Sequence, residues 1–413
     1  MDPNVNRIAF RKFNELLPAK RLERFAVKYG LDRKHSIKLS GPLMFLTLLR
    51  GLLGNQKVSL RLMASDYAEA TGISLDHSAI AKRLSSIKVD YFKDLFDYLS
   101  GILKDRINPR SPGPLSVHNV DATIVCISAK ICSFGIKRNT NKAGNKRSFV
   151  KSVFSLNDGM PNFLHLCKTP SELNDNIALG KTIVDTCVRG HVFVFDSGCD
   201  SRDKLLQIHE KGAYFITPHR TQGLGVKRVV WAADNPITPY EAPGPGEPGF
   251  IVTSVEECVF ETTTQKSRCK KYANMLLAVV HGLRYDRRDG TGWKPLDLMT
   301  NLPISPDSKL IGPYSYAEVA QLYGNRWEIE TFFKKIKGHL SFDHLLNTSE
   351  NGIKIMIYMT LITAMLMIWA RVVTNAKHGW NIVKFWLEVS CREWIELAIW
   401  AHRTPFIERC RGS

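Results

Sequence analysis

The N-terminal quarter of the chain carries apolar residues at helical spacing. The runs PLMFLTLLRGLL, from Pro42, and YFKDLFDYLSGIL, from Tyr91, place an apolar residue at roughly every third or fourth position. This part closes at NPRSPGP, whose prolines and glycine break helices. The pattern predicts a separate helical domain over residues 1–112.

Short runs of β-branched residues begin near residue 115. LSVHNVDATIVCI, SFVKSVFSL and FLHLC are followed by a helical segment from about 172 to 189 and by the strand HVFVFD. A second helix, near 201–211, leads to the strand AYFITP. This order predicts the first part of an α/β core over residues 113–220.

The remainder of the chain changes pattern twice. Residues 221–303 are rich in proline, glycine and β-formers, which predicts a mainly β insertion. Helical periodicity resumes at Ser315, so residues 304–375 are expected to complete the core and residues 376–413 to form a C-terminal helical segment. The apolar stretch from Ile355 to Ala370 has 16 residues, fewer than a membrane span needs, and is predicted to be a core helix.

The segment YGNRWEIETFFKKIK concentrates charge on one helix face. At roughly 100° per residue, Tyr323, Arg326, Glu330 and Lys337 fall within an arc of about 60°. The neighbouring arc is apolar and carries Ile329, Phe332, Phe333, Ile336 and Leu340. Cations suit a polyanion and a carboxylate suits a divalent metal, so this face predicts a site where a metal meets a phosphodiester.

Two aspartates are candidates to join Glu330. Asp121 lies inside a β-branched run, and Asp196 ends the run HVFVFD. Strand ends in an open α/β sheet face one crevice, so these three acids could converge and hold two Mg²⁺ ions. Taken singly, each acid has an ordinary explanation: Asp121 would pair with a nearby lysine, Asp196 would cap a turn, and Glu330 would pair with Lys334 four residues later.

Composition favours a nucleic-acid partner. The chain has 57 basic and 39 acidic side chains, a net charge of +18 spread along its length, and an isoelectric point near 9.5. The histidines form no H-E-x-x-H motif, and no phosphate-binding glycine loop is present. Nucleotide hydrolysis and zinc chemistry therefore have no visible site in the sequence.

The cysteines and the N-terminus indicate a reducing compartment. Nine cysteines include no C-x-x-C pair, and the N-terminal residues lack the apolar core of a secretion signal. We expect a cytoplasmic protein with reduced thiols and no membrane partner.

A helical pair in the N-terminal domain is compatible with a helix-turn-helix. One helix is expected to end near Gly72, and a second to begin near His77 and carry Lys82 and Arg83. Ser78 occupies a position where that motif expects an apolar residue. A helical pair with no DNA-reading role fits the same pattern, and both interpretations stay open.

The spacing Y-x2-R-x3-E-x6-K resembles the signature of bacterial insertion-sequence transposases of the IS-four type, within the wider DDE transposase and retroviral-integrase-like group. Asp121, Asp196 and Glu330 resemble, in order, the three metal-binding acids of that family. The resemblance covers about residues 115–370. It implies an α/β fold with an RNase H-like catalytic core, interrupted by a mainly β insertion and preceded by a helical DNA-binding domain.

The resemblance also implies a reaction. The three acids would bind two Mg²⁺ ions, with Mn²⁺ substituting, and a water would cleave a strand at the element's end. The released 3′-hydroxyl would then attack target DNA, which is cut-and-paste transposition. The partners implied are double-stranded DNA, both transposon ends and target, and a second copy of the chain in the synaptic complex. A non-transposing nuclease on the same fold and a catalytically inactive DNA-binding remnant are the alternatives.

Further DNA contacts follow from the same resemblance. Tyr323, Arg326 and Lys337 would hold a phosphate of the non-transferred strand, and Trp327 and Lys334 belong to the same segment.

A hairpin intermediate is not decided by the sequence. Family members that form one stack an insertion-domain tryptophan on an extruded base, just before the strand that here reads LDLMTN. This chain has Leu296 at the nearest position, and Trp293 is the candidate substitute.

Overall fold

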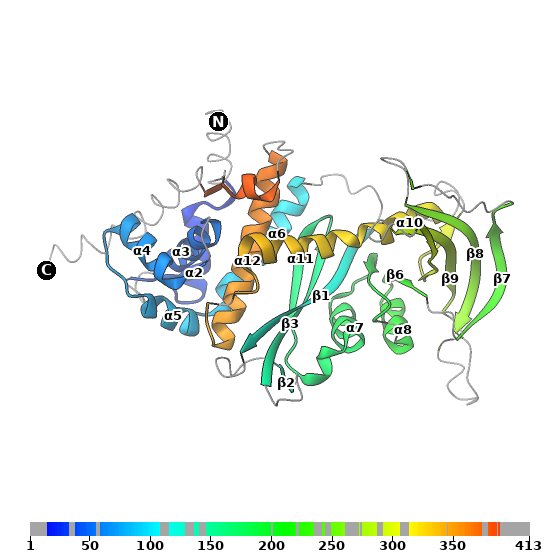
Figure 1. Cartoon of the computed structure of the whole chain (residues 1–413), viewed down its shortest axis with the longest axis horizontal. Helices are drawn as coiled ribbons and strands as arrows, with labels where there is room; N and C mark the ends of the chain where they lie inside the picture. The colour runs from blue at the N-terminus through cyan, green and yellow to red at the C-terminus, as the bar shows by residue number, and fades with distance from the viewer. Residues whose placement is uncertain are drawn as a thin grey trace.

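The structure is a computed structural model in which most strands form one large mixed sheet and helices pack around it (Figure 1). It describes residues 15–32, 38–54, 58–107, 115–128, 136–139, 146–199, 201–219, 223–234, 242–243, 249–260, 272, 275–286, 292–305, 314–344, 346–373, 379–385 and 387–388. The C-terminal segment expected at 376–413 lies mostly outside these residues.

The N-terminal part is helical, as its pattern predicts. Its helices are α2 (Ala19–Lys28), α3 (Gly41–Leu53), α4 (Leu60–Thr71), α5 (His77–Ser86) and α6 (Val89–Ile107). Gly72 ends α4 in the left-handed region at φ 62°. The Asp76 side chain starts α5 by accepting a hydrogen bond from the backbone of Ser78.

These helices share a hydrophobic core with later parts of the chain. Their buried residues belong to one hydrophobic core with α11 (Trp327–Leu340) and α12 (Glu350–Val373). Helix α12 lies between the N-terminal helices and the sheet (Figure 1) and packs against α3, α5 and α6. The helical part thus meets the sheet through α12 and through the direct contact of α6 with β4.

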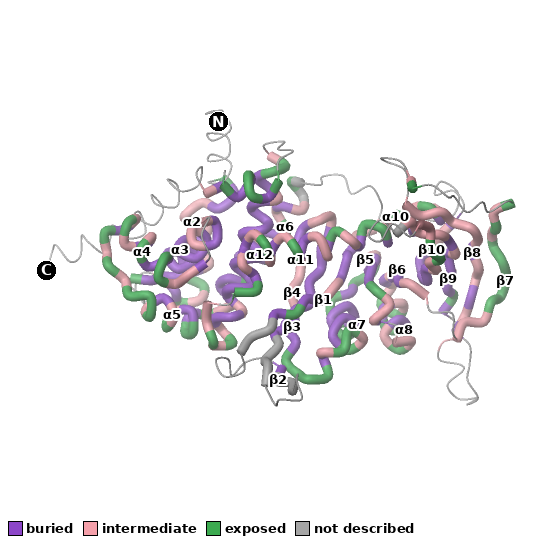
Figure 2. The backbone as a smooth tube through the Cα atoms, in the orientation of Figure 1, coloured by how far each residue is buried: buried purple, intermediate pink, exposed green. Residues whose placement is uncertain are grey.

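Helix α12 is the predicted core helix. It is long and apolar enough to cross a membrane, yet 83% of its most apolar window is buried inside the protein. In Figure 2 most of its tube is coloured as buried. The four cysteines whose side chains the structure describes are buried free thiols: Cys167, Cys187, Cys199 and Cys258.

The sheet begins with the strands expected from the β-branched runs. These are β1 (Ser116–Ser128), β2 (Ile136–Asn139), β3 (Lys146–Asn157), β4 (Met160–Leu166), β5 (His191–Val194) and β6 (Tyr214–Pro218). Strand β3 pairs with β1, β2 and β4 in antiparallel fashion. Strands β5 and β6 continue the sheet on the other side of β1, both parallel to it.

Residues 221–303 extend this same sheet. They supply β7 (Leu224–Ala232), β8 (Phe250–Phe260), β9 (Leu277–Asp286), β10 (Gly292–Pro295) and β11 (Leu298–Thr300). Strand β11 pairs with β6 and β9, so the order continues β6-β11-β9-β8-β7. The β-rich character is as expected, and the backbone pairing connects this part directly to the core. A two-stranded sheet of β12 (Ile304–Ser305) and β13 (Tyr314–Ser315) precedes α10 (Tyr316–Asn325).

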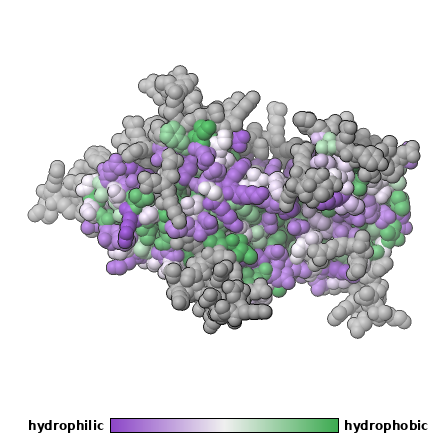
Figure 3. Space-filling model, viewed as in Figure 1, coloured by the Kyte–Doolittle hydropathy of each residue, from purple (hydrophilic) through white to green (hydrophobic). Residues whose placement is uncertain are grey.

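Helices cover both faces of the central strands. A short 3-10 helix, η1 (Pro170–Leu173), leads into α7 (Asp175–Thr186), which packs with α8 (Arg202–Glu210) on one face. Helix α10 covers part of the other face, where α11 contacts β1. Hydrophilic residues prevail on the described surface of the view in Figure 3.

Candidate active site

Asp121 and Asp196 extend from neighbouring parallel strands at the same level. Asn119 of β1 is paired in register with Val194 of β5, and each aspartate lies two residues beyond its member of that pair. Side chains alternate along a strand, so Asp121 points to the face that α10 and α11 cover. Asp196 follows the end of β5, and its charge acts on Tyr323 and Arg326, which lie on that face. In each aspartate, Oδ1 accepts a hydrogen bond of 2.7 Å from the backbone N–H of the next residue. The two carboxylates thus have matching local geometry on strands about 4.8 Å apart.

The segment that bears Glu330 is two helices, not the single uninterrupted helix that its periodicity predicts. The capping box of Ser315 and Glu318 starts α10, which ends at Asn325, and α11 begins at Trp327. At the break, the N–H of Arg326 donates to Tyr323 and the N–H of Ile329 donates to Arg326, each three residues back. The sequence pattern missed the break because Arg326 keeps right-handed helical dihedral angles and the periodicity passes through it.

The apolar face of α11 agrees with the sequence. The five residues predicted for it are all buried: Ile329, Phe332, Phe333, Ile336 and Leu340. Because this face packs into the core, Glu330 on the adjacent face is directed along the sheet toward Asp121.

Arg326 joins two of the predicted acids. Its Nη2 donates a 2.7 Å hydrogen bond to Oε1 of Glu330, and its Nη1 lies 3.7 Å from Oδ2 of Asp121. The residue is only 8% exposed. Asp121 and Glu330, far apart in the sequence, therefore meet at one buried guanidinium.

The electrostatics place Asp196 in the same group. Burial opposes the charged form of Arg326, but Tyr323, Asp196 and Glu330, followed by Asp121, hold its pKa above the usual value. All three predicted acids thus act on one cation.

Asp121 has a strongly perturbed carboxyl. Burial raises its pKa to about 6, the N–H of Ala122 and the guanidinium of Arg326 oppose this rise, and the charges of Glu330 and Asp175 add to it. A carboxyl of this kind is held in its charged form by a bound cation, so the site favours an additional positive charge.

The other members of the predicted signature lie at different distances from the acids. Tyr323 is buried with its ring 5.7 Å from the Arg326 guanidinium, and burial raises the pKa of its phenol. Lys337 is partly buried on α11, about 10 Å along the helix axis from Glu330. Lys334 lies over the ring of Trp327, 4.8 Å from its centre. Its role as the partner of Glu330 is taken by Arg326.

The two candidate positions for base stacking, Trp293 and Leu296, are both partly buried. Trp293 lies on β10, edge-on to Tyr285 with 5.6 Å between ring centres, and is partly exposed. Leu296 packs against the core under α10. Of these two, Trp293 alone offers an aromatic face near the surface.

Lys82 and Arg83 on α5 have different environments. Lys82 is exposed. Arg83 is half buried, its Nε donates a 2.9 Å hydrogen bond to the carbonyl of Leu39, and burial lowers its pKa. Arg83 therefore stabilises the packing of the N-terminal helices, and a DNA contact beside Lys82 stays a prediction for it.

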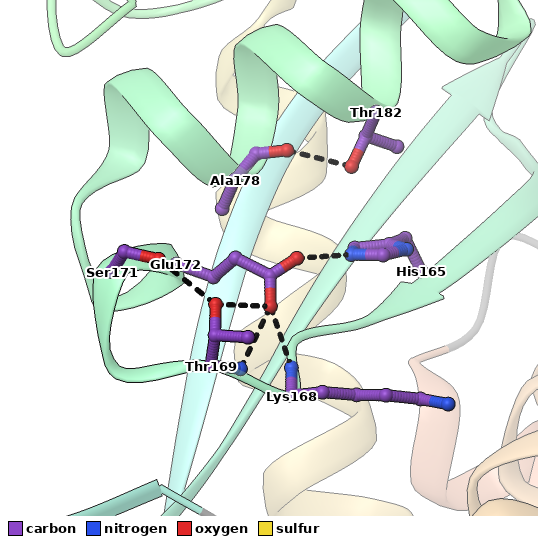
Figure 4. A network of polar contacts seen from close by, with 7 residues as sticks. All are labelled: His165, Lys168, Thr169, Ser171, Glu172, Ala178 and Thr182. Atoms are coloured by element: carbon purple, nitrogen blue, oxygen red, sulfur yellow. Dashed lines mark hydrogen bonds and ion pairs between the residues drawn. The ribbon is translucent and has the colours of Figure 1, made fainter.

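A second group of ligand-type side chains was not anticipated from the sequence. His165, Cys167 and Glu172 bring potential ligand atoms within 4.8 Å of one another. Glu172 Oε2 accepts from the backbone of Lys168 and Thr169, and its Oε1 lies 3.1 Å from His165 Nε2 (Figure 4). Burial raises the pKa of the Cys167 thiol to about 11, so it remains protonated. These hydrogen bonds show that Glu172 and His165 stabilise the turn before α7.

Asp175 is the other charged residue that sequence reasoning missed. It starts α7, and its Oδ1 accepts a 2.7 Å hydrogen bond from the ammonium of Lys151, a lysine that is 1% exposed. The Asp175 side chain lies against Gly198, which comes two residues after Asp196. The sequence gives no sign of this contact, because a single glycine and an acid at a helix start are common in any protein.

Known proteins are similar to this chain in sequence. The family model described as "Transposase DDE domain" matches residues 120–366. A Synechocystis protein named "Putative transposase for insertion sequence element IS4SA" is 26% identical over 328 residues, covering 78% of this chain and 80% of that protein. A Sinorhizobium fredii protein named "Putative transposase y4zB" is 26% identical over 287 residues, covering 68% of each.

One solved structure is also similar at low identity. It is a piggyBac transposase synaptic complex with hairpin DNA, with a TM-score of 0.41, 9% identity, and coverage of 94% of this chain and 78% of that one. The sequence resemblance to IS-four transposases is confirmed by the family match and the curated relatives. The match includes Asp121, Asp196 and Glu330 and spans more than half of the chain, and this protein belongs to the transposase DDE domain family.

Proposed function

We propose that this protein cleaves DNA at transposon ends and joins the released 3′-hydroxyls to target DNA by two-metal, in-line phosphoryl transfer. The observation that carries the proposal is the meeting of Asp121 and Glu330 at Arg326, with Asp196 beside Asp121 in parallel register. Double-stranded DNA and a second copy of the chain are the proposed partners, in the cytoplasm of a bacterium.

The sheet supports an RNase H-like core. Strands β4, β3 and β1 are antiparallel neighbours, and β5 and β6 follow on the other side of β1, parallel to it. The first acid lies on the central strand, the second follows the adjacent parallel strand, and the third comes from a helix laid on the sheet. The strands β7 to β11 enter between β6 and α10 as an insertion.

The three acids fit a pair of hard divalent cations. Their donor set is carboxylate oxygen alone, which Mg²⁺ prefers and Mn²⁺ accepts. The electrostatics agree, because Asp121 is partly buried near the carboxylate of Glu330, and the Arg326 guanidinium already lies between the two acids. When bound, two such ions would activate a water or a 3′-hydroxyl and stabilise the departing oxygen of the phosphodiester.

The residues around the acids have their own tasks in this proposal. Asp121, Asp196 and Glu330 hold the ions. Arg326, with Tyr323 and Lys337, holds a phosphate of the non-transferred strand, since a guanidinium binds phosphate through two donors. Trp327 and Lys334 flank that strand, Trp293 is the candidate for stacking on a base, and Lys82 contacts the duplex backbone. Such contacts place the scissile phosphate at the acids and leave chemistry to them.

A cleavage and joining assay tests the proposal. DNA bearing the element's terminal repeats is incubated with protein and Mg²⁺ or Mn²⁺, and both nicked and strand-transfer products are measured. We expect both products from the natural protein and at least a thousandfold loss after Asp121→Asn, Asp196→Asn or Glu330→Gln, with DNA affinity within a few-fold. Full activity of any of these variants would exclude the proposed site. Nicks without joined products would favour the nuclease, and DNA binding without either product would favour the inactive remnant.

A further inference from the structure

Asn119 lies close in the sheet to both strand aspartates, on the same face as Asp121. It lies on β1 two residues before Asp121, and its partner in β5, Val194, lies two residues before Asp196. Its side chain shares the face of Asp121 because both have odd numbers on one strand. Asn119 is 6% exposed, so its amide is removed from water.

The Asn119 amide reaches the break between α10 and α11. Its Nδ2 donates a 3.3 Å hydrogen bond to the carbonyl of Asn325, the last residue of α10. At this break the N–H of Ile329 donates to Arg326, which turns the Asn325 carbonyl toward the sheet. The same break that interrupts the helix therefore supplies the acceptor that Asn119 binds.

The Asn119–Asn325 hydrogen bond connects the strand that carries Asp121 to the helix junction that precedes Glu330. Asn325 directly precedes Arg326, and Glu330 lies just over one turn further along. The acceptor end of the Asn119 amide, Oδ1, is buried and receives no hydrogen bond from the described residues. The side chain is thus engaged through its donor end, toward the helix junction.

We propose that Asn119 is a positioning residue that sets the distance between Glu330 and the two strand aspartates. It touches neither a scissile phosphate nor a bound ion in this role. The hydrogen bond to Asn325 fixes where α11 starts over β1, and thereby where the Glu330 carboxylate lies. This inference rests on the proposed two-metal site and names a residue that the family signature does not contain.

The test compares two variants that both lose the amide donor. Asn119→Leu keeps nearly the same side-chain volume without a donor or a charge; Asn119→Ala removes the side chain beyond Cβ. We expect the Mn²⁺ dissociation constant, measured by calorimetry with end-bearing DNA present, to rise about tenfold in either variant. The rate constant for cleavage should fall at saturating Mn²⁺, while the DNA dissociation constant should stay within threefold.

Asn157→Ala is the matched control. Asn157 is a buried asparagine on the same sheet, whose Nδ2 donates 2.6 Å to the Val117 carbonyl of β1, away from the α10–α11 junction. Its loss should lower the melting temperature comparably while leaving Mn²⁺ affinity within twofold. A purely structural role for Asn119 would give the same result as this control.

A double-mutant cycle with Glu330→Gln separates positioning from other effects. If Asn119 acts through Glu330, Asn119→Ala should weaken Mn²⁺ binding in the natural protein and add less than twofold in the Glu330→Gln background. Full additivity, or unchanged Mn²⁺ affinity in both Asn119 variants, would overturn the inference. Absence of Mn²⁺ binding by the natural protein on DNA would instead overturn the proposed function.

Discussion

Arg326 and Glu330 form a 2.7 Å ion pair across one turn at the start of α11, and the same guanidinium lies 3.7 Å from Asp121. Arg326 is therefore the internal counter-ion of two acids proposed to hold metal. The same side chain is proposed to hold DNA phosphate, so the two roles compete for one guanidinium.

Arg326→Gln should separate these roles. Without DNA, we expect Mn²⁺ to bind about fivefold more tightly, because the competing cation is gone from between Asp121 and Glu330. DNA affinity should fall, and the slope of log affinity against log salt should shrink by about 0.9 for one lost phosphate contact. Calorimetry with Mn²⁺ and a salt series of binding isotherms measure both quantities.

Lys337→Gln is the control for this experiment. It removes an equal charge from α11, farther from the acids, so it should reduce the salt slope similarly and leave DNA-free Mn²⁺ affinity within twofold. If both variants gained Mn²⁺ affinity equally, the effect of Arg326→Gln would come from the change in net charge and not from the position of Arg326 between the acids.

The pKa of Asp121 predicts a pH-dependent penalty in stability. Its folded value of about 6 exceeds the ordinary 3.8, so the folded state binds more protons and the free energy of unfolding falls as pH rises from about 4 to 6. At pH 7.5 the penalty for metal-free protein is at most about 3 kcal/mol. Asp121→Asn should therefore stabilise the metal-free protein at pH 7.5 and by about half as much at pH 5.

Urea unfolding at the two pH values measures this effect. Saturating Mg²⁺ should reduce or reverse the advantage of Asp121→Asn, because the natural carboxylate then has a cation to bind. If the stability difference between Asp121→Asn and the natural protein did not change with pH, the raised pKa of Asp121 would be contradicted.

Lys151 and Asp175 predict an asymmetric pair of mutations. Lys151 is 1% exposed, whereas the Asp175 side chain is 55% exposed. Asp175→Ala should destabilise by about 3 kcal/mol, since it leaves a buried ammonium with the Leu173 carbonyl alone. Lys151→Met should cost about 1 kcal/mol, because the remaining carboxylate reaches water. Chemical denaturation of both variants checks the order, and the reverse order would refute this account.

Lys82 and Arg83 should respond in opposite ways. Lys82→Gln should weaken DNA binding without changing the melting temperature, as expected for an exposed cation. Arg83→Gln should lower the melting temperature by several degrees, because the Leu39 carbonyl loses its donor. Electrophoretic mobility shifts and thermal melts on the same preparations distinguish them. Loss of DNA affinity only in the Arg83 variant would reverse the assignment.

Local patterns in the sequence determined much of this protein. Helix α4 ends at Gly72 and α5 begins at His77, where the sequence places these bounds, and the buried face of α11 follows from its apolar spacing. The signature from Tyr323 to Lys337 also indicated the family that the comparisons show. These features succeed because capping and periodicity act over a few residues and are written in contiguous sequence.

Tertiary structure alone decided how these parts meet. The register of Asn119 with Val194, the guanidinium of Arg326 between two acids, and the extension of the sheet by β11 all join segments distant in the chain. The shared core of the N-terminal helices with α12 and the burial of Arg83 are of the same kind. Such contacts depend on which surfaces pack together. Hydrophobic periodicity predicts which face of an element is buried, but it does not predict which element that face packs against.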